Sequence, residues 1–130
     1  MQNIQPFDRP VLPESINKQT KIAINSTSGI FMVELNSIIF LQSDGPYTTI
    51  YSSAGENIVS SKNLMVYDNL LAPFGFFRVH RSYLISISKI VQYVRSDGGY
   101  VIMSNGARVD VSAKRREELL AKLSAEVLFL

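Results

Sequence analysis

The sequence predicts a mainly β domain of eight to ten short strands, with one mid-chain helix and one C-terminal helix. Short runs of alternating apolar and polar residues are separated by Gly, Pro, Asn and Asp turn signals, as in antiparallel β proteins. Helical spacing of apolar residues is confined to two segments, and strands do not alternate with helices as they do in doubly wound parallel sheets. The length of 130 residues, with 46% hydrophobic and 18% charged side chains, suits one folded domain.

The first twenty residues differ from the rest of the chain. Residues 1–20 contain three prolines and no apolar run, so we expect a linker or N-terminal arm rather than a signal peptide or membrane anchor. No later stretch has the roughly eighteen uninterrupted apolar residues of a membrane span. We therefore expect a single cytoplasmic domain over residues 21–130, with no segment inserted into a membrane.

Strand signals begin at Lys21 and give way to helical spacing near residue 63. Turn residues bound each strand expected in this half, which are Lys21–Ile24, Ile30–Leu35, Ile38–Leu41, Tyr47–Tyr51 and Glu56–Ser60. Apolar residues then recur at helical spacing until Pro73, which closes the segment. This predicts a helix over Asn63–Leu71, with Ser60 or Ser61 as its N-cap and a buried stripe of Leu64, Tyr67, Leu70 and Leu71.

The second half begins with hairpins and ends in a helix. Asp97-Gly98-Gly99 and Asn105-Gly106 are hairpin turn signals, and they join strands expected over Ile90–Arg95, Tyr100–Met103 and Ala107–Val111. Ser112 is a residue type preferred at helix N-caps. The apolar stripe that follows predicts a terminal helix with Leu119, Leu120, Leu123 and Val127 on its packed face.

The residues needed for most enzymatic chemistry are absent. The chain has no cysteine and one histidine, His80, which excludes thiolate zinc sites, cysteine nucleophiles and histidine-rich metal sites. A Ser-His-Asp hydrolase would need His80, and its neighbours Arg78 and Arg81 disfavour the imidazolium that this mechanism forms. No glycine-rich phosphate loop occurs, and acidic residues are spread out. We therefore expect no enzyme, no cofactor and no metal.

Charge is unevenly distributed, although the net charge is only +2. Residues 78–116 carry eight Lys and Arg residues against Asp97 and Asp110, a local charge of +6. The rest of the chain carries five basic and nine acidic residues, a charge of −4. A basic segment indicates an anionic partner if its cations gather in space, and an ordinary solvated surface if they scatter.

The run Phe76–Ile85 mixes cations and hydroxyls with aromatic residues. Its alternation fits a strand whose apolar residues face the core, yet Arg78, His80 and Arg81 then lie close together. Clustered like charges cost stability unless an anion compensates them, and the planar fork of arginine fits phosphate and guanine. The run therefore indicates an anion-binding site, although an amphipathic strand alone would account for the alternation.

Lys114, Arg115 and Arg116 follow Ser112 almost directly. If Ser112 caps the last helix, these cations occupy its first turn, where each opposes the helix dipole at a typical cost of ~0.3–1 kcal/mol. A basic first turn with free N–H groups is suited to binding phosphate. The alternative is that the helix begins later and that the three cations form a basic surface turn.

These two stretches and the strands between them resemble the LytTR-type DNA-binding domain of bacterial response regulators of the LytR/AlgR/AgrA family. The motifs occur in the family's order over about residues 21–123: Ile38-Ile-Phe-Leu-Gln-Ser-Asp-Gly-Pro-Tyr47-Thr-Thr-Ile50, Ser61-Lys62-Asn63-Leu64, Phe77-Arg-Val-His-Arg-Ser-Tyr-Leu-Ile85, Gly99-Tyr100-Val101, Ser104-Asn-Gly106 and Val111-Ser112. The resemblance implies about ten strands in small sheets, with loops rather than a recognition helix entering the DNA grooves.

The resemblance also implies sequence-specific binding of double-stranded DNA by a transcriptional regulator of a two-component system, without catalysis. Arg81 and groups near Tyr47, Thr48 and Lys114 would read base edges, and His80 belongs to the same expected site. Phosphates would be contacted by Lys62, Arg78, Lys114, Arg115 and Arg116. The partners implied are duplex DNA, a second copy on adjacent direct repeats, and a receiver or sensor domain joined to this one in a longer protein.

Two other functions fit parts of the sequence. A β-rich protein-interaction module would present Phe74, Phe76 and Phe77 on its surface and leave the basic residues dispersed. Binding of RNA or single-stranded DNA would use Tyr47, Tyr51 and Tyr83 as stacking platforms. The exposure of these aromatic residues therefore discriminates among the alternatives.

Overall fold

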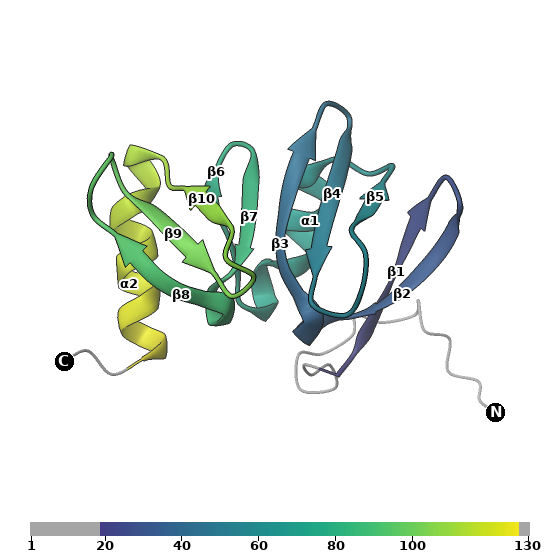
Figure 1. The fold of residues 1–130 in the computed structure, drawn as a ribbon, viewed down its shortest axis with the longest axis horizontal. Coiled ribbons are helices and arrows are strands. Elements are labelled where there is room, and N and C mark those ends of the chain that lie inside the picture. The colour runs from purple at the N-terminus through teal and green to yellow at the C-terminus, as the bar shows by residue number, and fades with distance from the viewer. Residues whose placement is uncertain (1–18, 128–130) are drawn as a thin grey trace.

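The computed structural model describes residues 19–127, which form ten strands in three antiparallel sheets together with two α-helices (Figure 1). This confirms the predicted mainly β class. All but two residues of the N-terminal arm expected over residues 1–20 lie outside the described range. The elements in chain order are β1 (Lys21–Ser26), β2 (Gly29–Glu34), β3 (Ile38–Asp44), β4 (Tyr47–Ser52), β5 (Ile58–Ser60), α1 (Leu64–Leu71), β6 (Phe76–His80), β7 (Tyr83–Ser86), β8 (Ile90–Val94), β9 (Tyr100–Met103), β10 (Arg108–Asp110) and α2 (Arg116–Glu126).

A five-stranded sheet of order β5-β4-β3-β7-β6 forms the centre of the molecule. A three-stranded sheet, β10-β9-β8, lies on one side of it with α2, and the β1–β2 ribbon lies on the other (Figure 1). Short 3-10 turns occupy Leu35–Ser37, Ala72–Phe74, Ile87–Lys89 and Ala113–Arg115.

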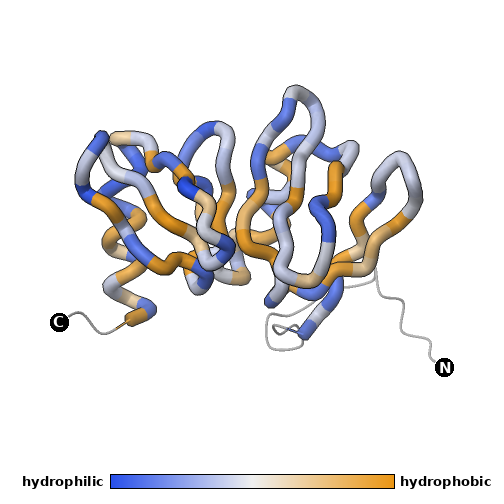
Figure 2. Tube along the Cα trace, in the orientation of Figure 1, coloured by the Kyte–Doolittle hydropathy of each residue, from blue (hydrophilic) through white to orange (hydrophobic). Residues whose placement is uncertain are grey.

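The central sheet is buried on both faces. One face packs against α1 and the ribbon, and the other packs against the small sheet and α2. Neighbouring residues of a strand point to opposite faces, so Leu84 belongs to the first core and Ile85 to the second. Burial on both faces also explains why Ile38–Leu41 is a continuous apolar run. Figure 2 shows hydrophobic residues along the strands and mostly hydrophilic or neutral residues at the hairpin tips.

The run Phe76–Ile85 forms a hairpin rather than one strand. β6 and β7 pair antiparallel, with His80 opposite Tyr83 and Arg81 at the tip. Side chains hold this turn, because the Arg78 guanidinium donates to the Arg81 carbonyl and the Ser82 N–H donates to His80 Nδ1 at 3.1 Å. The turn contains neither Gly nor Pro, which is why the sequence pattern did not mark it.

The cap of α1 differs from the prediction. Asn63 is the N-cap, and its Oδ1 accepts from the Val66 N–H at 3.1 Å. Ser60, one of the expected caps, is buried in β5. Of the predicted apolar stripe, Leu70 is the exception, because half of its surface is exposed.

The last helix begins later than the prediction based on Ser112. The Ser112 side chain makes no capping hydrogen bond, residues Ala113–Arg115 form a 3-10 turn, and α2 begins at Arg116. The first turn of α2 carries Glu117 and Glu118, as the helix dipole favours. Of the three cations expected in that first turn, only Arg116 belongs to α2, as its first residue, whereas Lys114 and Arg115 form a basic surface turn ahead of the helix. The later helix start given as the alternative is therefore correct.

The turn at Asn105-Gly106 is a three-residue loop. Gly106 has a φ of 86°, whereas Asn105 keeps a negative φ. The Gly106 N–H donates to the Met103 carbonyl at 2.8 Å, and the Met103 N–H donates to the Ala107 carbonyl at 2.9 Å. The hairpin is as predicted, but only one turn residue needs the left-handed conformation.

Candidate nucleic-acid interface

Strand register brings three connections to one edge of the central sheet, namely the edge at which the strands end and turn. Thr48 lies opposite Ser60 on β5 and opposite Ser43 on β3, and the Ser43 N–H donates to the Ser82 carbonyl at 2.9 Å. The β5–α1 connection, the β3–β4 turn and the β6–β7 turn therefore lie along the same edge, which is uppermost in Figure 1.

The basic turn ahead of α2 joins this edge beside β6. The Ser112 N–H donates to the Val79 carbonyl at 2.8 Å, which fixes the start of the turn against the strand. Between them lies a hollow of about 370 Å³, which is lined by five basic residues and one serine and by no acidic residue: Arg78, His80, Arg81, Ser112, Lys114 and Arg115. The two basic stretches singled out in the sequence thus converge. We call Lys62 together with Arg78, His80, Arg81, Lys114 and Arg115 the basic edge.

Three cations of the basic edge are exposed and free of ion pairs within residues 19–127: Lys62, Arg81 and Lys114. Arg108, by contrast, pairs with Asp97 and Asp110 at 3.9 and 3.2 Å. Unpaired cations on one edge leave a positive potential that attracts a polyanion.

Other members of the basic edge also have structural contacts. Arg78 and His80 are half-buried, and their bonds to Arg81 and Ser82 hold the β6–β7 tip, where the Arg81 side chain is exposed. Arg115 lies 3.5 Å from Glu118 and 5.8 Å from the centre of the Phe77 ring. These residues contribute charge, and they also fix the shape of the surface.

Arg116 faces away from the hollow. Its guanidinium donates to the Gly98 carbonyl in the β8–β9 turn, and its Nε is buried without a hydrogen-bond partner. Arg116 does not line the hollow. Its expected phosphate contact is therefore not supported by its position, which is that of a structural residue.

Tyr47 and Thr48 differ sharply in exposure. The Tyr47 side chain is 46% exposed beside the β3–β4 turn, whereas Thr48 is completely buried. The Thr48 hydroxyl donates to the Lys62 carbonyl at 2.8 Å. The Thr48 side chain is thus not available for the base contact expected from the resemblance.

The aromatic residues of the two alternative functions are largely buried. Phe76 and Phe77 are 5% and 6% exposed, and Phe74 packs against the first core, so these three phenylalanines do not form an exposed patch. Tyr51 stacks on Phe40 with ring centres 4.3 Å apart. Of the three tyrosines expected to stack on bases, only Tyr47 is exposed.

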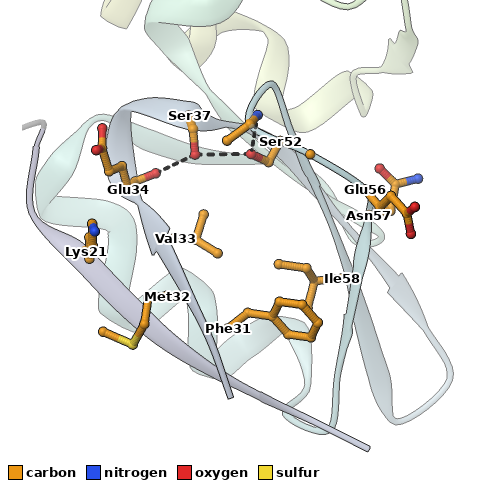
Figure 3. Close-up of a pocket in the computed structure, with 12 residues that line it drawn as sticks. Lys21, Phe31, Met32, Val33, Glu34, Ser37, Ser52, Glu56, Asn57 and Ile58 are labelled. Carbon is orange, nitrogen blue, oxygen red and sulfur yellow. Dashed lines mark hydrogen bonds between the residues drawn. The ribbon is translucent and has the colours of Figure 1, made fainter. Parts of the chain in front are cut away.

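A larger hollow lies elsewhere, between the ribbon and β5, and Figure 3 shows the residues that line it. Its volume is about 610 Å³, and Phe31, Val33 and Ile58 line it together with the charged side chains of Lys21, Glu34 and Glu56. Two carboxylates against one ammonium make it unsuitable for a polyanion. It is therefore separate from the basic edge in both place and charge.

Residues 19–127 contain no group of three or more His, Cys, Asp or Glu side chains placed to hold a metal ion. Within the same residues, neither helix has the length and apolar character needed to cross a membrane.

Sequence reasoning missed Ser112 as part of the surface. Ser112 was interpreted as a helix cap, and it instead lines the hollow in an extended conformation with φ −67° and ψ 150°. The only signal for a surface role was that Ser112 lies two residues before Lys114. A helix N-cap at Ser112 would have the same spacing, so the signal did not distinguish the two roles.

Known proteins with similar sequences include transcriptional regulators. The CO-responsive transcriptional regulator RcoM from Rhodospirillum rubrum is 28% identical over 103 residues, which are 78% of this chain and 42% of that protein. The heme-containing CO-sensing transcriptional regulator RcoM 2 from Paraburkholderia xenovorans is 30% identical over 102 residues, 76% of this chain and 38% of that protein. The chain thus spans about two fifths of the length of these relatives.

A solved structure has the same fold. A LytTr DNA-binding domain from Bacillus cereus superimposes with a TM-score of 0.70 at 21% identity, covering 80% of this chain and 96% of the other. The sequence profile of the LytTr DNA-binding domain matches residues 28–124, which include α1, all but the last two residues of α2, and every residue of the basic edge. The chain belongs to the LytTr DNA-binding domain family, whose members bind DNA in transcriptional regulation.

Proposed function

We propose that this domain binds double-stranded DNA sequence-specifically, without catalysis, within a bacterial transcriptional regulator that acts in the cytoplasm. The observation that carries the proposal is that Arg81 and Lys114, from distant parts of the chain, line one hollow with no acidic residue in it. A hairpin tip and a basic turn held side by side offer a surface that fits a groove and its flanking phosphates.

The exposure of each side chain suggests its role. Arg81 stands at the β6–β7 tip, where its planar fork can bond the O6 and N7 atoms of guanine in the major groove. Lys114 and Lys62 are exposed single charges suited to phosphate oxygens, which supply much of the affinity of such complexes. Tyr47 is exposed beside the β3–β4 turn, from which it would reach the same groove.

The first test is selection of binding sites from randomised duplex DNA, followed by measurement of Arg81→Ala. We expect wild-type protein to select a defined motif. The variant should lose ~1–3 kcal/mol of binding free energy and relax its preference at one base position. If Arg81→Ala keeps the wild-type preference at every base position, Arg81 contacts the DNA backbone and does not read a base. If the wild-type protein prefers no sequence, specific binding is refuted.

The alternative of single-strand binding is tested by competition. Only Tyr47 of the three candidate stacking residues is exposed, so we expect duplex DNA to displace a bound duplex far better than single-stranded DNA of the same sequence. The reverse order would favour the stacking function.

The wider assembly is also part of the proposal. The relatives whose names describe CO sensing are more than twice as long as the matched segment, so a sensor or receiver domain joined to this one would control DNA binding. Two copies would bind adjacent direct repeats, which predicts a stoichiometry of two on a paired site and one on a single site.

A further inference from the structure

Lys62 is held in place by a buried polar network, although its own side chain is exposed. The Thr48 hydroxyl donates to the Lys62 carbonyl at 2.8 Å, and the Lys62 N–H donates to Ser60 Oγ at 3.1 Å. Both backbone polar groups of Lys62 are therefore bonded to side chains of neighbouring strands.

The network continues into α1. The Tyr67 hydroxyl donates to Ser60 Oγ at 2.6 Å, and Thr48, Ser60 and Tyr67 are 0%, 0% and 5% exposed. A buried hydroxyl cannot bond to water, so leaving it without a hydrogen-bond partner costs stability. A network in which the buried hydroxyls are paired therefore favours one local geometry. Thr48 and Ser60 also lie opposite each other in the β4–β5 register.

The same geometry places Lys62 on the basic edge. Thr48 is the second residue after the β3–β4 turn, and its register partner Ser60 ends β5, so Lys62 leaves the sheet at the edge that carries the hairpin tips. The ammonium has no ion pair within the described residues. A phosphate contact by a flexible lysine is more favourable when its backbone is already fixed, because less conformational freedom is lost on binding.

We propose that Thr48 and Ser60 are positioning residues for DNA binding, acting through the backbone of Lys62, which contacts a phosphate. This inference rests on the proposed function and assigns Thr48 the support of a phosphate contact rather than a base contact. Tyr67 extends the same network into the core by fixing the Ser60 hydroxyl.

The test is a double-mutant cycle with Thr48→Val and Lys62→Ala, using a mixed-sequence duplex and measuring affinity against salt concentration. Thr48→Val should weaken binding roughly two- to tenfold, the range that one hydrogen bond typically contributes. Lys62→Ala should reduce the salt slope by about one unit. In the Lys62→Ala background, Thr48→Val should cause no further loss of affinity.

The matched control is Thr49→Val, the same substitution one residue along β4, where the side chain makes no hydrogen bond to the β5–α1 connection. It should leave affinity and salt slope unchanged. If Thr48→Val prevents folding, Ser60→Ala removes the acceptor of the Lys62 N–H and should give the same non-additivity. Equal losses from Thr48→Val with and without Lys62 would overturn the inference in favour of general destabilisation.

The inference and the proposed function fail in different ways. If Lys62→Ala leaves the salt slope unchanged while Arg81→Ala and Lys114→Ala weaken binding, the positioning role is wrong and DNA binding by the basic edge stands. If wild-type protein does not bind duplex DNA, both are wrong.

Discussion

Adjacent cations in one basic run have different roles because the backbone turns between them. Lys114 is exposed at the hollow, whereas Arg116 is half-buried and bonded to the Gly98 carbonyl. Sequence alone could not separate them, because both follow Ser112 and both carry one positive charge. The geometry of the 3-10 turn decides which of them faces a ligand.

This difference is measurable as salt dependence. Lys114→Ala should flatten the dependence of DNA affinity on salt by about one unit of slope, since one phosphate contact is lost. Arg116→Ala should leave the slope nearly unchanged and lower the free energy of unfolding instead, because the β8–β9 turn loses its bond. Equal loss of slope in both variants would show that Arg116 also reaches the DNA.

Two glycines with positive φ allow steric crowding to be separated from backbone strain. At Gly106, φ is 86° and an added Cβ would meet nothing within 4 Å; at Gly99, φ is 95° and the Cβ would lie 2.8 Å from the Tyr93 hydroxyl and 3.1 Å from Arg116 Nε. Gly106→Ala should cost ~1–2 kcal/mol of unfolding free energy from conformation alone. Gly99→Ala should cost about 1–3 kcal/mol more, because the site is overpacked. Chemical denaturation measures both costs. Equal costs would mean that the side chains of Tyr93 and Arg116 move away from the added methyl group without loss of stability.

At the scale of elements, the sequence predicted strands well where turn chemistry was explicit. Gly45 and Gly98 adopt positive φ at predicted turns, and the strands that flank them pair as expected. The β6–β7 turn was missed because the side chains of Arg78 and His80 hold it rather than Gly or Pro. The start of α2 was predicted too early because serine is a residue type preferred at N-caps. In the structure Ser112 makes no capping hydrogen bond and instead lines the hollow.

The capping of α1 gives an element-scale prediction. The Asn63 side chain bonds the Val66 N–H, whereas Ser61 is exposed and its side chain makes no hydrogen bond among the described residues. Asn63→Ala should therefore lower the free energy of unfolding by ~1 kcal/mol, and Ser61→Ala should leave it within about 0.5 kcal/mol of wild type. A larger loss of stability from Ser61→Ala than from Asn63→Ala would show that Ser61, as the sequence predicted, caps the helix.

At the scale of the whole molecule, the convergence of the two basic stretches depends on strand order, which local patterns do not encode. Arg81 and Lys114 come together because β6 is the edge strand of the central sheet and the Ser112 N–H bonds its Val79 carbonyl. Charge counts identified the residues, and the family resemblance implied their arrangement. The burial of Thr48 and the Tyr67–Ser60 bond could not be foreseen, since both depend on how α1 packs on the sheet.

That packing makes the stability of the whole domain sensitive to alkali. Burial raises the pKa of the Tyr67 hydroxyl above its ordinary value of 10.0, and the hydrogen bond to Ser60 lowers it to a smaller extent. Above pH 10.0 the unfolded chain loses this proton while the folded protein keeps it, so the free energy of unfolding falls as pH rises toward the folded-state pKa. Below pH 10.0 this contribution is fully present.

Tyr67→Phe isolates the effect. At neutral pH the variant should be less stable by ~0.5–1.5 kcal/mol, because the bond to Ser60 is lost. Its stability should decline less steeply above pH 10.0, so that the curves for variant and wild type approach each other in alkali. Chemical denaturation on both sides of that pH tests this. Parallel curves would mean that Tyr67 ionises equally in both states, and that the network beneath Lys62 is open to water.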